Sequence, residues 1–119
     1  MDDERVIVGS GNIYKDFGDP DAEEMHAKSK LVIQIHKIIE ERGLTQRQAA
    51  EILGIDQPKV SNMLRGRFRG FSVSKLMEFL NALDQDVEII VRPKAAGQEH
   101  GRTIVRLVAE DEAAYAVEG

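Results

Sequence analysis

The stretch QRQAAEILGIDQPKVSNML, residues 46–64, decides the fold of this chain. Gly54 divides it into two short helical segments, and glycine is favoured where a chain turns sharply with φ > 0 at a helix end. Ala50 has the small side chain needed where two helices meet closely. Val60, six residues after the glycine, is expected to face back into that contact. This spacing of alanine, glycine and valine predicts a helix-turn-helix.

Capping residues predict where the two helices begin and end. Thr45 is the predicted N-cap of the first helix, which ends at Leu53. Asp56 is expected to cap the second helix through its carboxylate, and Pro58 suits the first turn, where its missing N–H is no loss. The second helix is predicted from about Gln57 to Arg65. Its core-facing residues are expected to be Val60, Met63 and Leu64.

Helical periodicity predicts one further helix on each side of this motif. The first is capped by Asp19 or Asp21 and ends at Arg42–Gly43, and the second is capped by Ser72 or Ser74. The apolar residues of the first helix are Leu31, Val32, Ile35, Ile38 and Ile39. Those of the second are Val73, Leu76, Met77, Leu80 and Leu83. The aromatic residues expected in the core or at its edge are Phe68, Phe71 and Phe79.

The pattern changes from helical to alternating after residue 86. Residues 87–92 (VEIIVR) predict a strand that ends at Pro93, and residues 103–108 (TIVRLV) predict a second strand. A single short hairpin is only marginally stable by itself. We therefore expect these strands to pack on the helices or to pair with a second subunit, and we favour a sheet shared across a two-fold axis.

Positive charge is concentrated in one part of a chain whose net charge is −5. The window from Gln57 to Met77 has no acidic residue and a charge of +5, so the remaining residues carry −10. The cationic residues of this window are Lys59, Arg65, Arg67, Arg69 and Lys75. A local basic surface binds phosphate even on an acidic protein, whereas the acidic remainder is expected to suppress non-specific binding and to suit a different partner.

The quoted stretch resembles the helix-turn-helix of the Cro/C1-type (XRE) family. A longer match, from about Asn12 to Pro93, resembles the small antitoxin-type regulators of the HigA kind. The sequence segments that show this resemblance are NIYKDFGDPDAEE, LTQRQAAEILGIDQPKVSNMLRG and FSVSKLMEFLNALDQDVEIIV. The resemblance implies a transcriptional regulator that binds a palindromic operator on double-stranded DNA as a homodimer, with a HigB-like toxin ribonuclease as a further partner.

The expected fold is mainly α: a lambda-repressor-like helix-turn-helix bundle of four to five helices with a short C-terminal β element. The length of 119 residues suits one domain. We expect a flexible leader at 1–20, a DNA-binding domain at 21–85 and a strand or hairpin extension, a candidate for dimerisation, at 86–109. The acidic segment at 110–119 is expected to form a short helix or to remain disordered.

The predicted DNA-binding residues lie on the motif and on the basic loop after it. Gln46 and the helix N-termini suit phosphate oxygens, and Gln57 has the donor and acceptor pair that matches the N6/N7 edge of adenine. Base edges or phosphates are the expected contacts of Lys59, Ser61 and Asn62. Phosphates or a minor groove are the expected contacts of Arg65, Arg67 and Arg69. The resemblance implies the same roles for Gln46, Gln57, Lys59, Ser61 and Asn62. The alternative is that these residues form only a solvated helix face.

Other functional classes find little support in the sequence. The absence of cysteine excludes disulfides, thiolate zinc sites and a cysteine nucleophile, and it is compatible with a cytoplasmic location. His26, His36 and His100 lack the i, i+4 spacing of a helical metal site. No catalytic motif occurs and no apolar run reaches membrane-spanning length, so we expect no enzyme, no cofactor, no metal and no membrane contact.

Three functions remain open from the sequence. An antitoxin that represses its own operon is favoured, in which the acidic surface outside the basic window faces a basic toxin. A stand-alone repressor without a toxin is a variant of the same function. The third is a protein-interaction module that keeps the helix-turn-helix fold but does not bind DNA, because fold alone does not determine function.

Overall fold

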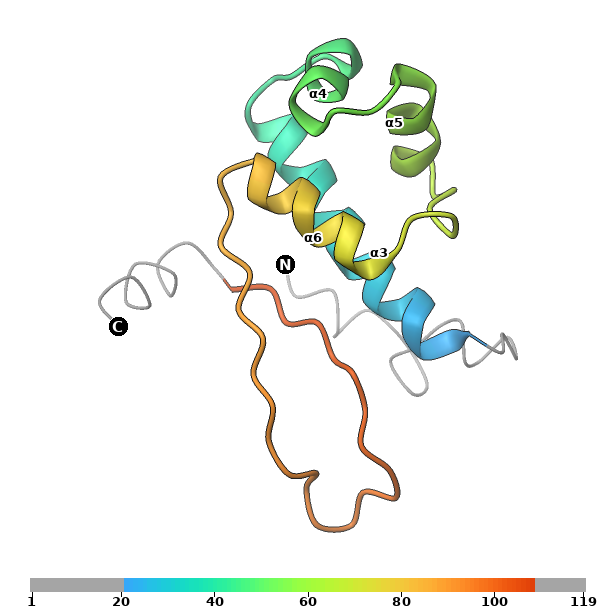
Figure 1. Cartoon of the computed structure of the whole chain (residues 1–119), viewed down its shortest axis with the longest axis vertical. Coiled ribbons are helices and arrows are strands. Elements are labelled where there is room, and N and C mark those ends of the chain that lie inside the picture. Colours follow the sequence, from blue (N-terminus) through green and yellow to red (C-terminus); the bar gives the residue numbers. More distant parts are fainter. Residues whose placement is uncertain (1–20, 109–119) are drawn as a thin grey trace.

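The computed structural model describes residues 21–108, which contain four α-helices (Figure 1). The helices are α3 (Ala22–Glu41), α4 (Gln46–Leu53), α5 (Gln57–Leu64) and α6 (Val73–Ala82). They confirm the four helices predicted from periodicity and capping, and no fifth helix or strand occurs within residues 21–108. The predicted leader at 1–20, with Asp19, and the acidic segment at 110–119 lie outside the described residues.

The long helix α3 packs mainly against α6 and also contacts α5. Its apolar stripe is buried, and the helix ends at Glu41, with Arg42 as its C-cap and Gly43 next at φ 63°. Asp21 occupies the N-cap position, but its side chain makes no capping hydrogen bond, contrary to the prediction. Its carboxylate instead pairs with the guanidinium of Arg69 at 3.5 Å. Arg42 joins the ends of two helices, because it donates to the Leu83 carbonyl at 2.7 Å.

The helix-turn-helix is formed by α4 and α5, as the sequence predicted. Thr45 and Gln48 form a reciprocal capping box at the start of α4. Gly54 ends α4 with φ 71°, in the left-handed region, and its N–H donates to the Ala50 carbonyl at 2.8 Å. Val60 of α5 is completely buried in the contact between the helices.

The predicted carboxylate cap at Asp56 is not formed. Asp56 is the N-cap residue of α5 and has extended backbone angles, but its side chain makes no capping hydrogen bond. A capping side chain accepts from the N–H of the second or third helical residue. Here the second is Pro58, which has no N–H, and the third, Lys59, donates to the Asp56 backbone carbonyl at 3.0 Å. Neither of the two donors that a cap needs therefore binds the carboxylate.

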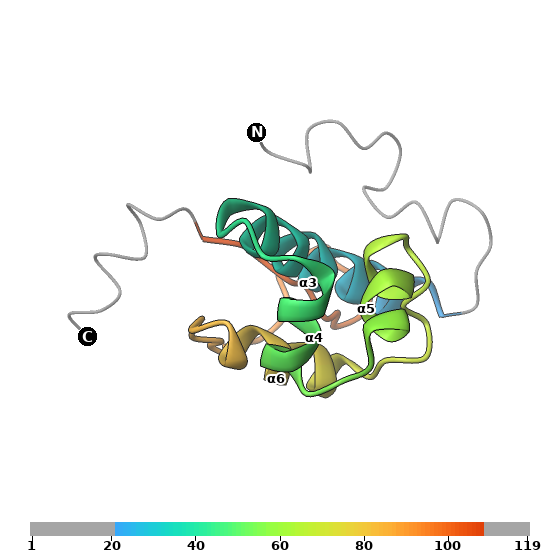
Figure 2. The ribbon, with the colours of Figure 1, turned by 90° about the horizontal axis from the view of Figure 1, so that it is seen from above.

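The hydrophobic core lies where α3, α4, α5 and α6 meet. Helices α3 and α6 pack directly against each other, and α4 and α5 lie together at one end of this pair (Figures 1 and 2). Helix α6 begins at Val73 and is capped by Ser72, one of the two predicted caps, whose hydroxyl accepts from the Lys75 N–H at 3.0 Å. Of the three predicted aromatic core residues, Phe68 and Phe79 are buried and Phe71 is half-buried. The largest side chains that are almost completely buried are Phe79, Ile35, Met63, Leu76, Leu83 and Val60.

The predicted C-terminal hairpin is wrong as a hairpin within one chain. Residues 85–108 form an open extended loop that projects from the helices (Figure 1). Among residues 21–108, no strand is formed and no backbone hydrogen bond joins 87–92 to 103–108. The alternating pattern correctly indicated extended backbone, but the two segments do not pair with each other.

Candidate nucleic-acid interface

One face of α5 is available for DNA because the opposite face is anchored in the core. Val60 and Met63 are completely buried. Gln57, Pro58 and Lys59 at the start of the helix are exposed, and the predicted contact residues Ser61 and Asn62 are half-buried. Burial of one side therefore fixes the rotation of α5 and directs its polar residues outward, as a recognition helix requires.

The two helix N-termini carry backbone donors without an acceptor in the part of the chain that the structure describes. Gln46 is the first residue of α4 and is exposed. Among residues 21–108, the N–H groups of Gln46, Arg47 and Gln57 have no hydrogen-bond partner. Such groups at a helix start attract phosphate oxygens. Arg47 is exposed beside Gln46 and was not predicted from the sequence.

A shallow groove between α5 and α6 brings three of the predicted residues together. Lys59, Asn62 and Arg67 line it, and Lys75 from the first turn of α6 lines it as well. Its floor and remaining edge are formed by Ile55, Gly70 and Phe71. Three cationic side chains therefore surround one amide. Lys75 belongs to the predicted basic window but had no predicted contact, because the sequence identifies α6 by its apolar residues.

Lys75 is held near this groove by its own helix. Its Nζ lies 5.7 Å from the centre of the Phe79 ring and 3.5 Å from a carboxylate oxygen of Glu78. Phe79 itself packs edge-on against Phe71, with ring centres 5.6 Å apart. The Lys75 ammonium is exposed, so the ion pair with Glu78 is weak and a phosphate can replace it.

Arg65 lies along the exposed side of α5. Its guanidinium donates to the Ser61 hydroxyl oxygen at 3.0 Å, one helical turn earlier. The hydroxyl hydrogen of Ser61 remains able to donate to another acceptor. The two residues therefore present a guanidinium and a hydroxyl on the same helix surface.

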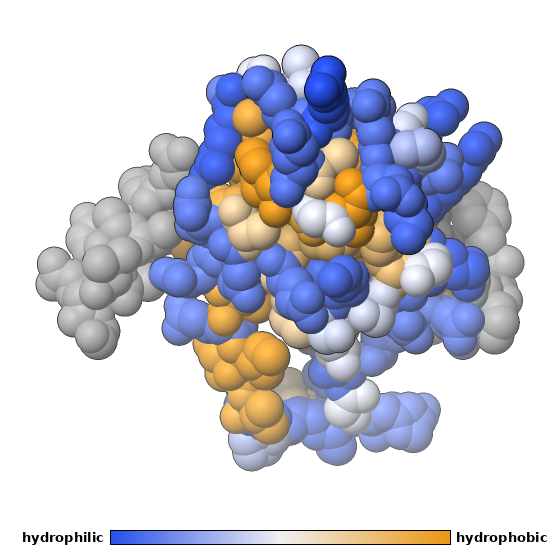
Figure 3. Space-filling view, turned by 45° about the horizontal axis from the view of Figure 1, so that its top comes forward, coloured by the Kyte–Doolittle hydropathy of each residue, from blue (hydrophilic) through white to orange (hydrophobic). Residues whose placement is uncertain are grey.

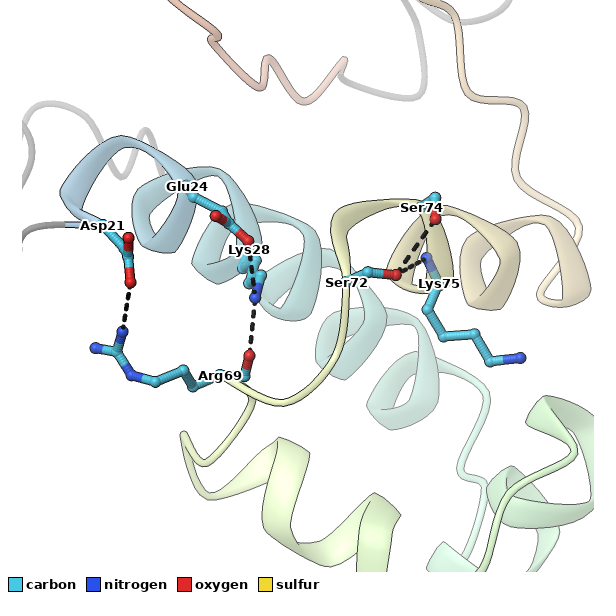
Figure 4. A network of polar contacts seen from close by, with 7 residues as sticks. All are labelled: Asp21, Glu24, Lys28, Arg69, Ser72, Ser74 and Lys75. Carbon is cyan, nitrogen blue, oxygen red and sulfur yellow. Dashed lines mark hydrogen bonds and ion pairs between the residues drawn. The ribbon is translucent and has the colours of Figure 1, made fainter.

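Arg69 is separated from the other predicted arginines by the fold of the loop. Its guanidinium faces Asp21 at the start of α3 (Figure 4). Its backbone carbonyl accepts from Lys28 Nζ at 2.8 Å, and the same ammonium pairs with Glu24 at 3.1 Å. Lys28 is only 4% exposed, so this contact attaches the basic loop firmly to α3. No sequence pattern indicated Lys28, because its partner lies 41 residues away.

No cluster of three or more potential metal-ligating His, Asp or Glu side chains occurs between residues 21 and 108. The helices of that same region are also too short or too polar to cross a membrane.

Comparisons with known proteins agree with this geometry. Residues 13–92 match a family described as a helix-turn-helix domain. A solved structure described as an XRE family transcriptional regulator is 45% identical, with a TM-score of 0.70. The alignment covers 75% of this chain and 100% of that chain. The comparison with curated proteins finds no match. The architecture of α4 and α5, the family match and this relative together show that the chain belongs to the XRE-type helix-turn-helix family of DNA-binding regulators.

Proposed function

We propose that the protein is a sequence-specific transcriptional repressor that binds a palindromic operator as a homodimer. The observation that supports this most strongly is the exposed polar face of α5 beside a groove lined by Lys59, Arg67 and Lys75. A helix anchored by its apolar side and flanked by cationic groups suits a major groove bordered by phosphates.

Each part of the surface has a separate role in this proposal. Gln57 and Asn62 contact base edges, because an amide supplies both a donor and an acceptor to adenine. Gln46, Lys59 and Ser61 contact bases or the adjacent phosphates. Arg65 and Arg67, with Lys75 added from the structure, contact phosphates. Arg69 contributes less to binding, because its guanidinium lies beside Asp21 at the start of α3 and not in the groove that Arg67 lines.

A homodimer follows from the small number of base pairs that one helix contacts. Two copies related by a two-fold axis would place their α5 helices about 34 Å apart, on successive turns of one face of the duplex. The operator would then be palindromic. The extended residues 85–108 offer a surface for such pairing, because most of their large apolar side chains are exposed.

The proposed antitoxin function is more specific than operator binding, and two observations support it. The sequence resembles HigA-type antitoxins, and the chain outside the window 57–77 carries −10, which suits a basic toxin. A small basic reading frame beside this gene would favour the antitoxin. The absence of such a frame would favour the stand-alone repressor.

A gel-shift titration with the DNA upstream of the gene tests the proposal. Binding is measured at about 50 and about 200 mM salt, with and without the product of the adjacent frame. We expect a shift at nanomolar protein that weakens steeply with salt and changes mobility when a toxin is added. Equal, weak binding to upstream and random DNA would instead support the protein-interaction module.

A further inference from the structure

The segment 87–92 is extended, mostly apolar and unpaired within the described residues 21–108. Ile89 and Ile90 are each 74% exposed, and Val91 is 90% exposed. Apolar side chains of the extension stand out beneath the helices in Figure 3. Within residues 21–108, the backbone groups of this segment make no hydrogen bond to any other backbone group. An extended segment with these properties is a template for pairing with another strand.

The second extended segment, residues 103–108, is attached to the helices. The Thr103 N–H donates to a carboxylate oxygen of Glu23 at 2.8 Å, and Val105 packs against the core. At the start of the extension, Val87 also packs against the core. The segment from Glu88 to Arg92 therefore begins at a fixed position on the body and then leaves it, available to a partner.

The sequence of this segment is complementary to itself when two copies run antiparallel. If Ile90 lies opposite the partner's Ile90, then Glu88 lies opposite the partner's Arg92, and Ile89 lies opposite the partner's Val91. Each copy thus contributes one acidic and one basic residue to two cross-strand pairs of opposite charge. A shift of one residue in either direction places Glu88 opposite Val91 or Pro93 and removes both pairs.

We propose that two copies of this chain pair residues 88–92 as an antiparallel β-ribbon centred on Ile90. The inference rests on the homodimer of the proposed function and specifies its interface and register. On one face of the ribbon, the central isoleucines are flanked by two ion pairs. Glu88 pairs with the partner's Arg92, and Arg92 pairs with the partner's Glu88. On the other face, Ile89 meets the partner's Val91.

This second face is adjacent to a groove on α6. Ile89 and Val87 line that groove together with Ser74, Met77 and Asn81. Pairing in the proposed register brings the partner's Val91 beside Ile89 at the edge of this groove. The most exposed large apolar side chain of the extension, Val91, is thereby covered, which supplies the apolar burial that a two-stranded ribbon needs.

Single cysteines test the register, because the chain contains no cysteine of its own. Directly opposite residues have Cβ atoms about 4.5–5.5 Å apart, close to disulfide geometry, whereas diagonal residues are about 7–8 Å apart. In a glutathione redox buffer without DNA, we expect Ile90→Cys to form a covalent dimer. Ile89→Cys and Val91→Cys should each remain largely uncross-linked alone and should form a cross-linked heterodimer when mixed.

The cysteine results separate the register from the other possibilities. All three positions are exposed, so the variants should fold like the wild type, which far-UV circular dichroism checks. Efficient cross-linking of Ile89→Cys or Val91→Cys alone, or none for Ile90→Cys, would overturn the proposed register. Failure of the cross-link with intact operator binding removes this interface alone, whereas cross-linking without any DNA binding contradicts the repressor.

Charge exchange provides an independent test by sedimentation. Glu88→Arg and Arg92→Glu each create like-charged pairs, and we expect each variant to raise the dimer dissociation constant about tenfold. The double variant Glu88→Arg/Arg92→Glu should restore wild-type dimerisation. An equimolar mixture of the two single variants should also restore it, because the heterodimer has only pairs of opposite charge. If neither the double variant nor the mixture recovers wild-type dimerisation, the proposed pairing is wrong.

Discussion

At the scale of single residues, the surroundings of a polar side chain indicate its role. It can contact bases, bind phosphate or stabilise the fold. Gln57 is exposed at the start of α5 and has an amide that matches one base edge. Arg67 lines the basic groove, whereas the guanidinium of Arg69 is paired with Asp21. These three residues therefore have different expected effects, although the sequence alone gave Arg67 and Arg69 the same expected contacts.

For Gln57→Ala, we expect a loss of binding free energy on the order of 1–3 kcal/mol on the preferred operator, because alanine cannot form the bidentate hydrogen bonds to a base. Binding to random DNA should change little. Fluorescence anisotropy on operator duplexes substituted at each position measures this, and the preference should relax at one base pair in each half-site. An equal loss on operator and random DNA would remove Gln57 from the residues that contact bases.

For Arg67→Ala, we expect weaker binding on every sequence, because the guanidinium no longer neutralises a phosphate. The slope of log K against log salt should fall in magnitude by about 1 for each phosphate that is no longer neutralised. Arg69→Ala is the matched control from the same loop and should change the slope less, since its guanidinium lies at the start of α3, outside the groove that Arg67 lines. A larger change for Arg69→Ala than for Arg67→Ala would contradict this assignment.

At the scale of elements, local sequence predicted the helices well because their ends depend on nearby residues. Thr45 and Gly54 set the limits of α4 through contacts within a few residues. The predicted cap at Asp56 failed because Pro58 removes one of the donors that the carboxylate needs. The extension shows a different limit. Alternation predicts extended backbone, but the partner of a strand need not lie in the same chain.

The sequence likewise indicated only part of the candidate site. The residues of α5 follow from their position in the motif, so Gln57 and Asn62 could be proposed from the sequence. Lys75 and Lys28 were not, because their importance comes from packing between distant segments. Lys28 contacts the carbonyl of a residue 41 positions away, and no periodicity or motif encodes that contact.

Gly54→Ala tests the turn between α4 and α5. Gly54 has φ 71°, and a Cβ added there would meet no atom within 4 Å. The cost is therefore conformational, and we expect a loss of unfolding free energy of about 1–2 kcal/mol. Urea unfolding followed by far-UV circular dichroism measures it. Gly70→Ala, which has equal space and no positive φ, should be nearly neutral. Equal stability of the two variants would contradict the role of Gly54.

Lys28→Met tests the attachment of the basic loop to α3. The substitution keeps the apolar stem but leaves the Arg69 carbonyl without the Lys28 donor, for an expected loss on the order of 1–3 kcal/mol. Lys37→Met, at an exposed position of the same helix, is the control and should change the unfolding free energy little. If both variants unfold at the same urea concentration, Lys28 does not hold the loop.

At the scale of the whole molecule, function follows from an uneven distribution of charge and apolar surface. The acidic chain carries one basic window, and that window coincides with the exposed face of α5 and the groove beside it. The extension places exposed apolar residues away from this surface, where a second copy can pair. We expect dimerisation and DNA binding to use separate parts of the chain. A substitution can therefore disrupt one surface without unfolding the part that carries the other.

The measurement that tests the central claim most directly is a competition between two duplexes for the wild-type protein. One is the site selected from a random-sequence library, and the other has the same base composition in shuffled order. At about 150 mM salt, we expect the selected site to bind at least about 10³-fold more tightly and to be palindromic. Equal affinity for the two duplexes would show that the exposed face of α5 does not recognise sequence.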